Sequence, residues 1–231
     1  MHKRPLLALA LLLVCVCSQA LSTHCGKLLP GDVQISVLRF ASERNEIGSM
    51  EMQLNEILSI QRQHIVGRDE ATPPQGFLIA KWDFQEAKEL LKKGYALMAR
   101  VRGELVGYCF VVQGSVFVNY FRPATDSFKH IENADGQLPD FHQLPYLYQV
   151  AVKKDWERQN VGTLLVEKAK ERSPDGLFVG ILEFPHNNVA SFDLFSNAGF
   201  RQIAVLVAEG YRSFGSKRSR ILLWDRSSAA E

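Results

Sequence analysis

The spacing of apolar residues along the chain switches several times between the period of a strand and that of a helix. Short apolar runs rich in β-branched and aromatic residues predict strands over residues 33–40, 95–101, 105–112, 147–152, 177–184, 201–208 and 220–224. Apolar residues three and four positions apart predict helices over at least the second half of residues 42–65, and over residues 83–91, 161–172 and 189–197. This order predicts one α/β domain with a mixed sheet of seven strands and helices on both faces.

Turn and capping residues support several of these boundaries. Gly103 lies in a short polar turn between two apolar runs, which predicts a β-hairpin. Asp83 and Asn188 each precede a helical pattern, where a side-chain oxygen can cap the helix. Residues 147–184 predict a strand, a helix and a second, parallel strand, which together make a βαβ unit.

Residues 113–146 form the least regular part of the chain. Aromatic residues stand there among Asp, Asn, Gly and Pro. The start of this region, residues 115–121, is compatible with a strand that extends the sheet, and the rest is predicted to be a long loop. Loops of that length inside a compact domain are usually functional or disordered.

The first twenty residues have a pattern of their own. A basic start with Lys3 and Arg4 precedes an unbroken apolar run over residues 6–17 and small or polar residues at 18–20. This layout is typical of a secretory signal peptide cleaved near Ala20, although an uncleaved membrane anchor remains an alternative. The remaining chain then divides into a tether at 21–32, a domain at 33–225 and a tail at 226–231.

Charge and cysteine content narrow the classes of partner. The chain of 231 residues is 46% hydrophobic and 23% charged, and its formal net charge of +2 falls to zero without Lys3 and Arg4. A neutral chain gives no support for binding nucleic acid or an acidic membrane surface. Only Cys25 and Cys109 follow the leader, too few for a disulfide framework, and the six His residues show no metal-site spacing.

The predicted location is the secretory pathway or the cell exterior, with an organelle or the cytoplasm as alternatives. The chain holds no Asn-x-Ser/Thr sequon and no disulfide framework. The domain therefore has the composition of an intracellular protein but follows a leader typical of exported proteins, and the sequence does not decide between the two locations.

Residues 147–163 carry the first sign of chemistry. An apolar strand, a charged turn and the start of a helix follow one another directly. Such a turn aims the free backbone N–H groups of the helix, and the positive end of its dipole, at one point. That point attracts phosphate groups.

The same stretch resembles the acetyl-CoA motif of the GNAT superfamily of N-acetyltransferases. That motif is a strand ending in Ala-Val, a short turn, and then Arg/Gln-x-x-Gly-x-Gly/Ala at the start of a helix. Here Ala151 and Val152 end the strand and Gly162 matches the last position, whereas Glu157 replaces Arg or Gln and Asn160 replaces the first Gly. Asn tolerates unusual backbone angles better than other non-Gly residues.

Residues 182–200 resemble the second signature of this family. In that pattern a strand ends in Leu-Glu-Val, an Asn caps the next helix, and the helix ends before Gly-Phe. The matching residues are Leu182, Glu183, Phe184, Asn188, Ala190, Leu194, Gly199 and Phe200. With the order of elements, the resemblance extends over residues 33–224.

The resemblance implies an enzyme that transfers the acetyl group of acetyl-CoA to a primary amine by direct attack. The amine is a peptide amino terminus, a lysine or a small amine. The strands at 147–152 and 177–184 are expected to splay apart, so that the pantetheine arm of the coenzyme pairs with the first and the Val152 amide donates to the oxyanion. The implied coenzyme-binding residues are Val150, Ala151, Val152, Arg158, Gln159, Asn160, Val161, Gly162, Thr163, Asn188 and Phe195.

Two positions are candidates for proton transfer. Glu183 occupies the place from which some relatives take the proton of the amine; the alternative is a strand-end carboxylate that is solvated or paired with a Lys or Arg. Phe195 replaces the Tyr that protonates the leaving thiolate in many relatives, and Phe has no proton to donate. Water or Tyr211 would have to fill that role, unless Tyr211 is only a loop residue.

Two rival functions remain open. One is a non-catalytic module that binds acyl-CoA, which Glu157, Asn160 and Phe195 favour. The other is an exported interaction protein that kept the scaffold without coenzyme binding. In the enzyme interpretation, the loops at 113–146 and 210–219 are predicted to select the acceptor.

Overall fold

The computed structural model describes residues 30–65, 76–78, 81–120, 129–132, 138–209 and 216–225. The predicted signal peptide, most of the tether, the tail and Tyr211 lie outside the described residues. No helix among the described residues is both long and apolar enough to span a lipid bilayer.

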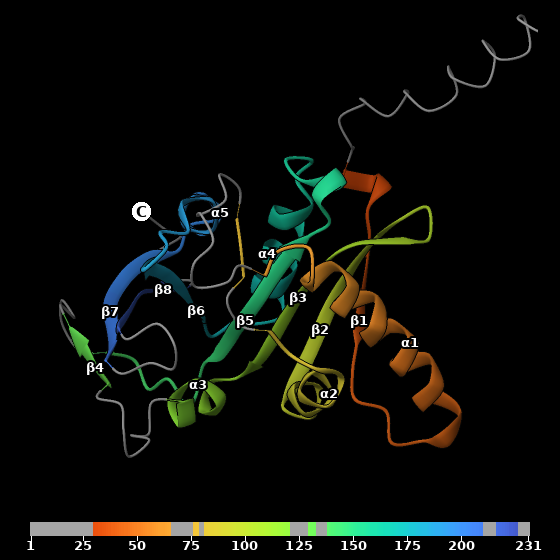
Figure 1. Cartoon of the computed structure of the whole chain (residues 1–231), viewed down its shortest axis with the longest axis horizontal. Coiled ribbons are helices and arrows are strands. Elements are labelled where there is room, and N and C mark those ends of the chain that lie inside the picture. The colour runs from red at the N-terminus through yellow and green to blue at the C-terminus, as the bar shows by residue number, and fades with distance from the viewer. Residues whose placement is uncertain are drawn as a thin grey trace, which may run out of the picture.

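One mixed sheet forms the centre of the molecule, with strand order β1-β2-β3-β5-β6-β8-β7-β4 (Figure 1). The strands are β1 Gln34–Leu38, β2 Gly94–Val101, β3 Glu104–Gln113, β4 Lys129–Glu132, β5 Pro145–Val152, β6 Leu177–Phe184, β7 Arg201–Glu209 and β8 Ser216–Trp224. The helices are α1 Arg44–Gln61, α2 Phe84–Lys92, α3 Gly114–Tyr120, α4 Val161–Glu171 and α5 Val189–Asn197, with short 3₁₀ turns η1 Pro30–Asp32 and η2 Lys154–Trp156. The α/β class and the mixed sheet are confirmed, but the sheet has eight strands and not seven.

Helices cover both faces of the sheet because its strands alternate their apolar side chains between two cores. Leu97 and Ala99 of β2 pack with the buried face of α4, including Leu165. Ala96 and Met98 of the same strand pack on the other side, with α1 and α2. The prediction of helices on both faces is thus confirmed.

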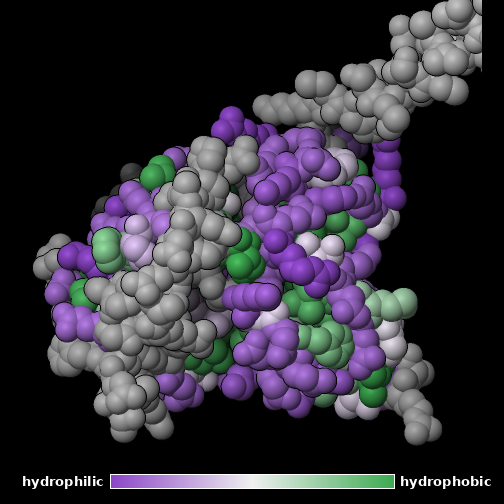
Figure 2. Space-filling view, in the orientation of Figure 1, coloured by the Kyte–Doolittle hydropathy of each residue, from purple (hydrophilic) through white to green (hydrophobic). Residues whose placement is uncertain are grey.

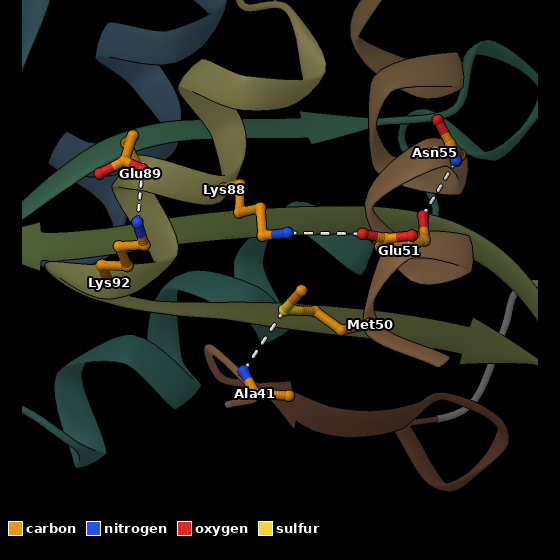
Figure 3. A network of polar contacts seen from close by, with 7 residues as sticks. All are labelled: Ala41, Met50, Glu51, Asn55, Lys88, Glu89 and Lys92. Atoms are coloured by element: carbon orange, nitrogen blue, oxygen red, sulfur yellow. Dashed lines mark hydrogen bonds and ion pairs between the residues drawn. The ribbon is translucent and has the colours of Figure 1, made fainter. Parts of the chain in front are cut away.

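Helices α1 and α2 form one docked layer (Figure 3). Asp83 and Glu86 cap α2 reciprocally, since each side chain accepts a 2.9 Å hydrogen bond from the backbone N–H of the other. Lys88 of α2 pairs with Glu51 of α1 at 3.4 Å across the two helices. A partly exposed pair of this kind contributes about 1 kcal/mol or less, so the buried apolar residues of both helices do most to hold the layer in place.

The outer surface of the molecule is mostly hydrophilic in the view of Figure 2. Hydrophobic residues appear there only in small, separate patches. Most large apolar side chains of the described residues are instead buried against the two faces of the sheet.

Strands β5 and β6 run parallel and separate soon after they meet. Their register contains only the pairs Tyr146–Phe178 and Leu147–Val179. Beyond these pairs, β5 continues along β3 up to Val152, and β6 continues along β8 up to Phe184. The predicted splay of the two strands is therefore present, and it opens a gap in the middle of the sheet.

Two predictions for the irregular region are wrong. Residues 114–120 form α3 and not a strand, because Phe117 is buried in a cluster with the rings of Phe141, Tyr146 and Phe178 at 4.9–5.4 Å. The loop predicted after it contains the short strand β4, which pairs with the free edge of β7. In α3 these contacts override the local strand propensity, whereas β4 becomes a strand through its pairing with β7.

Candidate active site

The turn between β5 and α4 has a backbone conformation that few side chains adopt. Arg158 and Asn160 have φ angles of 60° and 67°, in the left-handed region. The helical hydrogen bonds of α4 begin with the Leu164 N–H, which donates to the Asn160 carbonyl at 3.1 Å, and the Asn160 side chain makes no capping bond. The first N–H groups of α4 are thus available to a ligand.

A cavity of about 460 Å³ lies at this helix start. Of the predicted coenzyme-binding residues, its walls include Val150, Ala151, Val152, Arg158, Asn160, Val161, Gly162 and Thr163. A Cβ at Gly162 would lie 3.6 Å from Leu194 and 3.7 Å from Val152, at ordinary contact distance. The protein itself therefore does not require glycine at position 162, whereas a ligand held close to the backbone would.

The edge of β5 that faces the gap presents backbone groups that no neighbouring strand pairs with. The Lys153 N–H donates to the Val106 carbonyl of β3 at 2.8 Å, so the Val152 carbonyl on the same peptide points the other way, into the gap. Because the N–H and C=O of one strand residue point to the same edge, the Val152 N–H faces the gap as well. This is the edge along which an extended ligand can pair.

His64 contacts this edge, and no pattern in the sequence predicts the contact. Its Nε2 donates to the Val152 carbonyl at 2.7 Å, and its Nδ1 lies 3.8 Å from Oε1 of Glu157. Glu157, the acidic residue at the motif's Arg/Gln position, is therefore turned toward an imidazole. His64 follows α1 and is separated by 88 residues from Val152, so no motif could have revealed the contact.

A second cavity, of about 270 Å³, adjoins the first along β5. The two share Phe77, Leu78, Val150 and Ser191 in their walls. Aromatic side chains, among them Trp82, Phe117, Tyr146, Tyr148 and Phe195, line the smaller cavity together with the charged residues Lys81, Glu86 and Lys217. It adjoins the larger cavity at Val150 of β5.

The described segment 76–78 crosses between β5 and α5 (Figure 1). Phe77 is buried, and its carbonyl accepts a 2.9 Å hydrogen bond from Asn188 Nδ2. The Leu78 N–H donates to the His64 carbonyl at 2.9 Å. Asn188 also caps α5, since its Oδ1 accepts from the Ser191 N–H at 3.2 Å, so the predicted cap is confirmed.

Glu183 is held by arginines at the end of β6. Arg220 donates to its Oε1 from Nη2 at 3.1 Å and from Nε at 3.3 Å, and Arg218 Nε lies 3.7 Å from Oε2. Glu183 lines neither cavity. Glu183 is therefore engaged in an ion pair with Arg220, and its role as general base stays a prediction.

Phe195 is buried in the apolar core below α4, with its ring 5.2 Å from that of Phe200, and it also forms part of the smaller cavity. A hydroxyl that the sequence interpretation did not consider lies nearby in the gap. A Cβ at Gly180 would lie 3.3 Å from the Tyr146 hydroxyl, so glycine at this position leaves room for that hydroxyl between β5 and β6. Gln159, another predicted coenzyme contact, lines neither cavity and donates to the Asp155 carbonyl at 3.2 Å.

A buried polar relay supports β5 from the α1 side. The Tyr108 hydroxyl donates to Gln149 Oε1 at 2.5 Å, and Gln61 Nε2 donates to the same oxygen at 3.3 Å. The Gln61 Oε1 in turn accepts from the Trp82 backbone N–H at 3.3 Å. Burial raises the pKa of Tyr108 well above its ordinary value, so its hydroxyl remains a neutral donor.

The described side chains contain no group of three or more His, Cys, Asp or Glu placed to share a metal ion. Cys109 is buried in the core beside α4. Burial raises the pKa of its thiol, which keeps the sulfur protonated and unreactive.

The splayed parallel strands, the strained turn and the free helix start define a fold of the GNAT type. The chain belongs to the GNAT family of acetyltransferases, whose model, described as "Acetyltransferase (GNAT) family", matches residues 59–200. Acetyl-CoA is the acetyl donor of this family. No curated protein is significantly similar to the chain in sequence.

Solved structures agree with the assignment of the fold. The chain is similar to smu.2055 from Streptococcus mutans UA159, with 12% identity and a TM-score of 0.53 over 83% of this chain and 98% of that one. It is similar to a putative GNAT acetyltransferase from Desulfovibrio desulfuricans, with 12% identity and a TM-score of 0.50 over 84% and 98%. It is also similar to the ribosomal-protein-alanine N-acetyltransferase from Brucella melitensis, with 20% identity and a TM-score of 0.50 over 82% and 99%.

Proposed function

We propose that the protein transfers the acetyl group of acetyl-CoA to a primary amine by direct attack, without a covalent enzyme intermediate. The observation that carries this proposal is the opening of the sheet directly after the Leu147–Val179 pair. Because of it, the free edge of β5 and the start of α4 face one cavity. A ligand with an extended arm and a diphosphate fits that combination of a strand edge and a helix N-terminus.

The start of α4 would hold the diphosphate. The N–H groups of Val161, Gly162 and Thr163 are not used by the helix itself, and Arg158 adds a positive charge beside them. Glu157 is the one acidic side chain in the described wall of this cavity, and its contact with His64 draws it toward a group that can carry positive charge. The residues present therefore fit the coenzyme.

The edge of β5 would position the reacting group. Acetyl-CoA supplies an acetyl group activated as a thioester. The Val152 N–H, which faces the gap, can donate to a carbonyl oxygen that gains negative charge during the attack. The segment 76–78 lies at the same gap, so the contact between Asn188 and Phe77 would have to rearrange when the arm enters.

The smaller cavity would receive the amine. It adjoins the first at Val150, which places an amine there next to a thioester lying along β5. A thiolate leaving group has a pKa of about 8.5, so a dedicated acid in place of Phe195 is helpful and not essential. A peptide amino terminus, a lysine and a small amine are all primary amines that meet this requirement.

A non-catalytic module that binds acyl-CoA is the second candidate. The position of Glu183 favours it, because this carboxylate lines neither cavity and its Oε1 already accepts hydrogen bonds from Arg220. In that case the family's coenzyme site would serve binding alone.

Calorimetry and a transfer assay separate these functions. We expect acetyl-CoA to bind to the full chain with one site, and thiol release to appear when peptide and small-amine acceptors are added. If acetyl-CoA binds but no acceptor gives thiol release, the protein is the non-catalytic module. If acetyl-CoA does not bind, both of these functions fail and an interaction protein is the remaining candidate.

A further inference from the structure

A short strap of backbone lies across the gap between β5 and β6. It consists of residues 64–65, which follow α1, and the segment 76–78. Ile65 and Leu78 join the two pieces in a parallel β-bridge. The Leu78 N–H also donates to the His64 carbonyl at 2.9 Å, so the two pieces form one hydrogen-bonded unit.

The strap is fastened to both sides of the gap. On the β5 side, His64 Nε2 donates to the Val152 carbonyl at 2.7 Å. On the β6 side, the buried ring of Phe77 packs on Leu182. The Phe77 carbonyl accepts a 2.9 Å hydrogen bond from Asn188 Nδ2, directly before α5. The strap therefore reaches both strands beyond the point where their pairing ends.

The strap also separates the two cavities. Phe77 and Leu78 lie in the walls of both, and Gly76 lies in the wall of the larger one. An extended arm that runs along β5 from the larger cavity to the smaller one meets the strap on its way. The Val152 carbonyl, which such an arm could pair with, already accepts from His64.

We propose that the strap gates the coenzyme site: the thioester arm of acetyl-CoA enters the gap only after the segment 76–78 has moved away from α5. This inference rests on the proposed acetyl transfer and adds a conformational step to it. The contacts of the strap named above do not involve residues 161–163, so the diphosphate can reach the start of α4 while the strap is closed. A few hydrogen bonds and one apolar contact hold the segment, and a set this small can open locally without unfolding the domain.

A disulfide that holds the strap against α5 tests the proposal. A Cβ at Gly76 would lie 3.7 Å from the Cβ of Ala190, which is the separation found in disulfides. The full chain with both Gly76→Cys and Ala190→Cys is oxidised with diamide, and peptide mass spectrometry verifies the bond. Calorimetry measures acetyl-CoA affinity before and after reduction. We expect the oxidised form to bind about a hundredfold more weakly, because the form that admits the arm is no longer populated.

Two controls separate the arm from the rest of the ligand. 3′-Phosphoadenosine 5′-diphosphate carries the phosphates of the coenzyme without the arm, and it should bind the oxidised and reduced forms equally. The single variants Gly76→Cys and Ala190→Cys cannot form the bond, so oxidation should change the acetyl-CoA affinity of neither.

Association kinetics measure the same step without a disulfide. Trp156 lines the larger cavity, so tryptophan fluorescence in a stopped-flow experiment follows binding. In the wild type, the observed rate should reach a plateau as the acetyl-CoA concentration rises, because opening of the strap becomes limiting. Phe77→Ala removes the ring that packs on Leu182 and should raise this plateau about tenfold.

Equal acetyl-CoA affinity of the oxidised and reduced forms would overturn the inference while leaving the proposed function in place. Failure of the two cysteines to form the bond, equal losses of both ligands on oxidation, or a plateau that Phe77→Ala leaves unchanged would each overturn it as well. If the wild type does not bind acetyl-CoA at all, the proposed function fails first, and this inference fails with it.

Discussion

Asn160 and Arg158 hold strained backbone conformations in the turn that precedes α4. A non-glycine residue in the left-handed region is uncommon, and two such residues within three positions, with φ angles of 60° and 67°, are rarer still. This turn redirects the chain so that the first N–H groups of α4 face the larger cavity. Asn160 therefore does here what glycine does in the family motif.

Gly162→Asp tests the phosphate role of this turn. The new carboxylate would stand against the diphosphate, so we expect acetyl-CoA affinity, measured by calorimetry, to fall by at least a hundredfold. Gly48→Asp is the matched control: it adds the same charge on α1, where a Cβ meets no atom within 4 Å, and should leave affinity unchanged. Unchanged affinity in Gly162→Asp would remove the phosphate role from this turn.

Phe195 is the residue where the sequence departs most from the expected chemistry. It lies at the smaller cavity, where a hydroxyl could protonate a leaving thiolate, but a phenyl ring cannot do so. The ring also packs in the core against Phe200, so the position serves both packing and the site.

Phe195→Tyr is expected to leave kcat unchanged or to raise it a few-fold, because it restores a proton donor beside the thioester. Thiol release at saturating acetyl-CoA measures the effect. Phe200→Tyr adds a hydroxyl to the neighbouring ring, which lines neither cavity, and should give no increase. A large loss of kcat in Phe195→Tyr at unchanged thermal stability would show that the hydroxyl blocks the cavity.

At the scale of elements, β5 and β6 can separate because each keeps another neighbour. Strand β5 continues its pairing with β3, and β6 continues with β8, so both remain ordered while their facing edges come apart. The edges then hold backbone groups without a sheet partner, which is costly unless something else satisfies them. His64 satisfies one of them, the Val152 carbonyl.

Asn188 links α5 to the segment 76–78, and two substitutions separate its roles. A Ser at 188 can still cap α5, whereas Ala cannot, so we expect Asn188→Ser to be about 1 kcal/mol more stable than Asn188→Ala in denaturant unfolding. Both variants lose the donor to the Phe77 carbonyl.

Hydrogen exchange at the Leu78 N–H reports the second role. Both variants keep the hydrogen bond from the Leu78 N–H to the His64 carbonyl. We nevertheless expect faster exchange of this amide, because a segment no longer held at residue 188 opens more often. Unchanged exchange in both would mean that the hydrogen bond to Phe77 does not hold the segment in place.

At the scale of the whole molecule, two helical layers bury the central strand β3 from both sides. Cys109 of this strand packs toward α4, and Tyr108 packs toward α1. Burial raises the pKa of both side chains, because it disfavours their charged forms. Below the pKa that each side chain has in the unfolded chain, its burial contributes fully to the free energy of unfolding. As the pH rises above that unfolded-state pKa, this contribution is progressively lost.

Cys109→Ala tests this linkage. The unfolded thiol ionises with a pKa of about 8.5, so between pH 9 and 10 we expect the wild type to lose about 1 kcal/mol of unfolding free energy per pH unit more than the variant. Urea unfolding of both proteins at the two pH values measures the difference. Parallel changes in the two proteins would show that the thiol also ionises in the folded state.

Much of the fold could be predicted because its signals are local. The bounds of β6 and α5, the cap at Asn188 and the capping residue Asp83 agree with the sequence pattern to the residue. The errors fall on α3 and β4. Residues 114–120 have the β-branched and aromatic content of a strand, but the burial of Phe117 among distant rings makes them a helix.

The candidate site could be predicted in part for the same reason. The wall formed by residues 150–152 and 158–163 follows from a contiguous motif, since a strand, a turn and a helix start are adjacent in the chain. His64 and Trp82 carry no such signal, because they reach the site from the α1–α2 side across the sheet.

By itself, the sequence determined the class of the domain, the order of its main elements and the position of the turn at the start of α4, since these depend on periods and caps that act over a few residues. Only the tertiary structure decided the eighth strand, the pairing of Glu183 with Arg220, and the contacts of His64, Phe77 and Trp82 at the gap. Those contacts join segments that are distant in the chain and that only the tertiary fold brings together, so no local pattern encodes them.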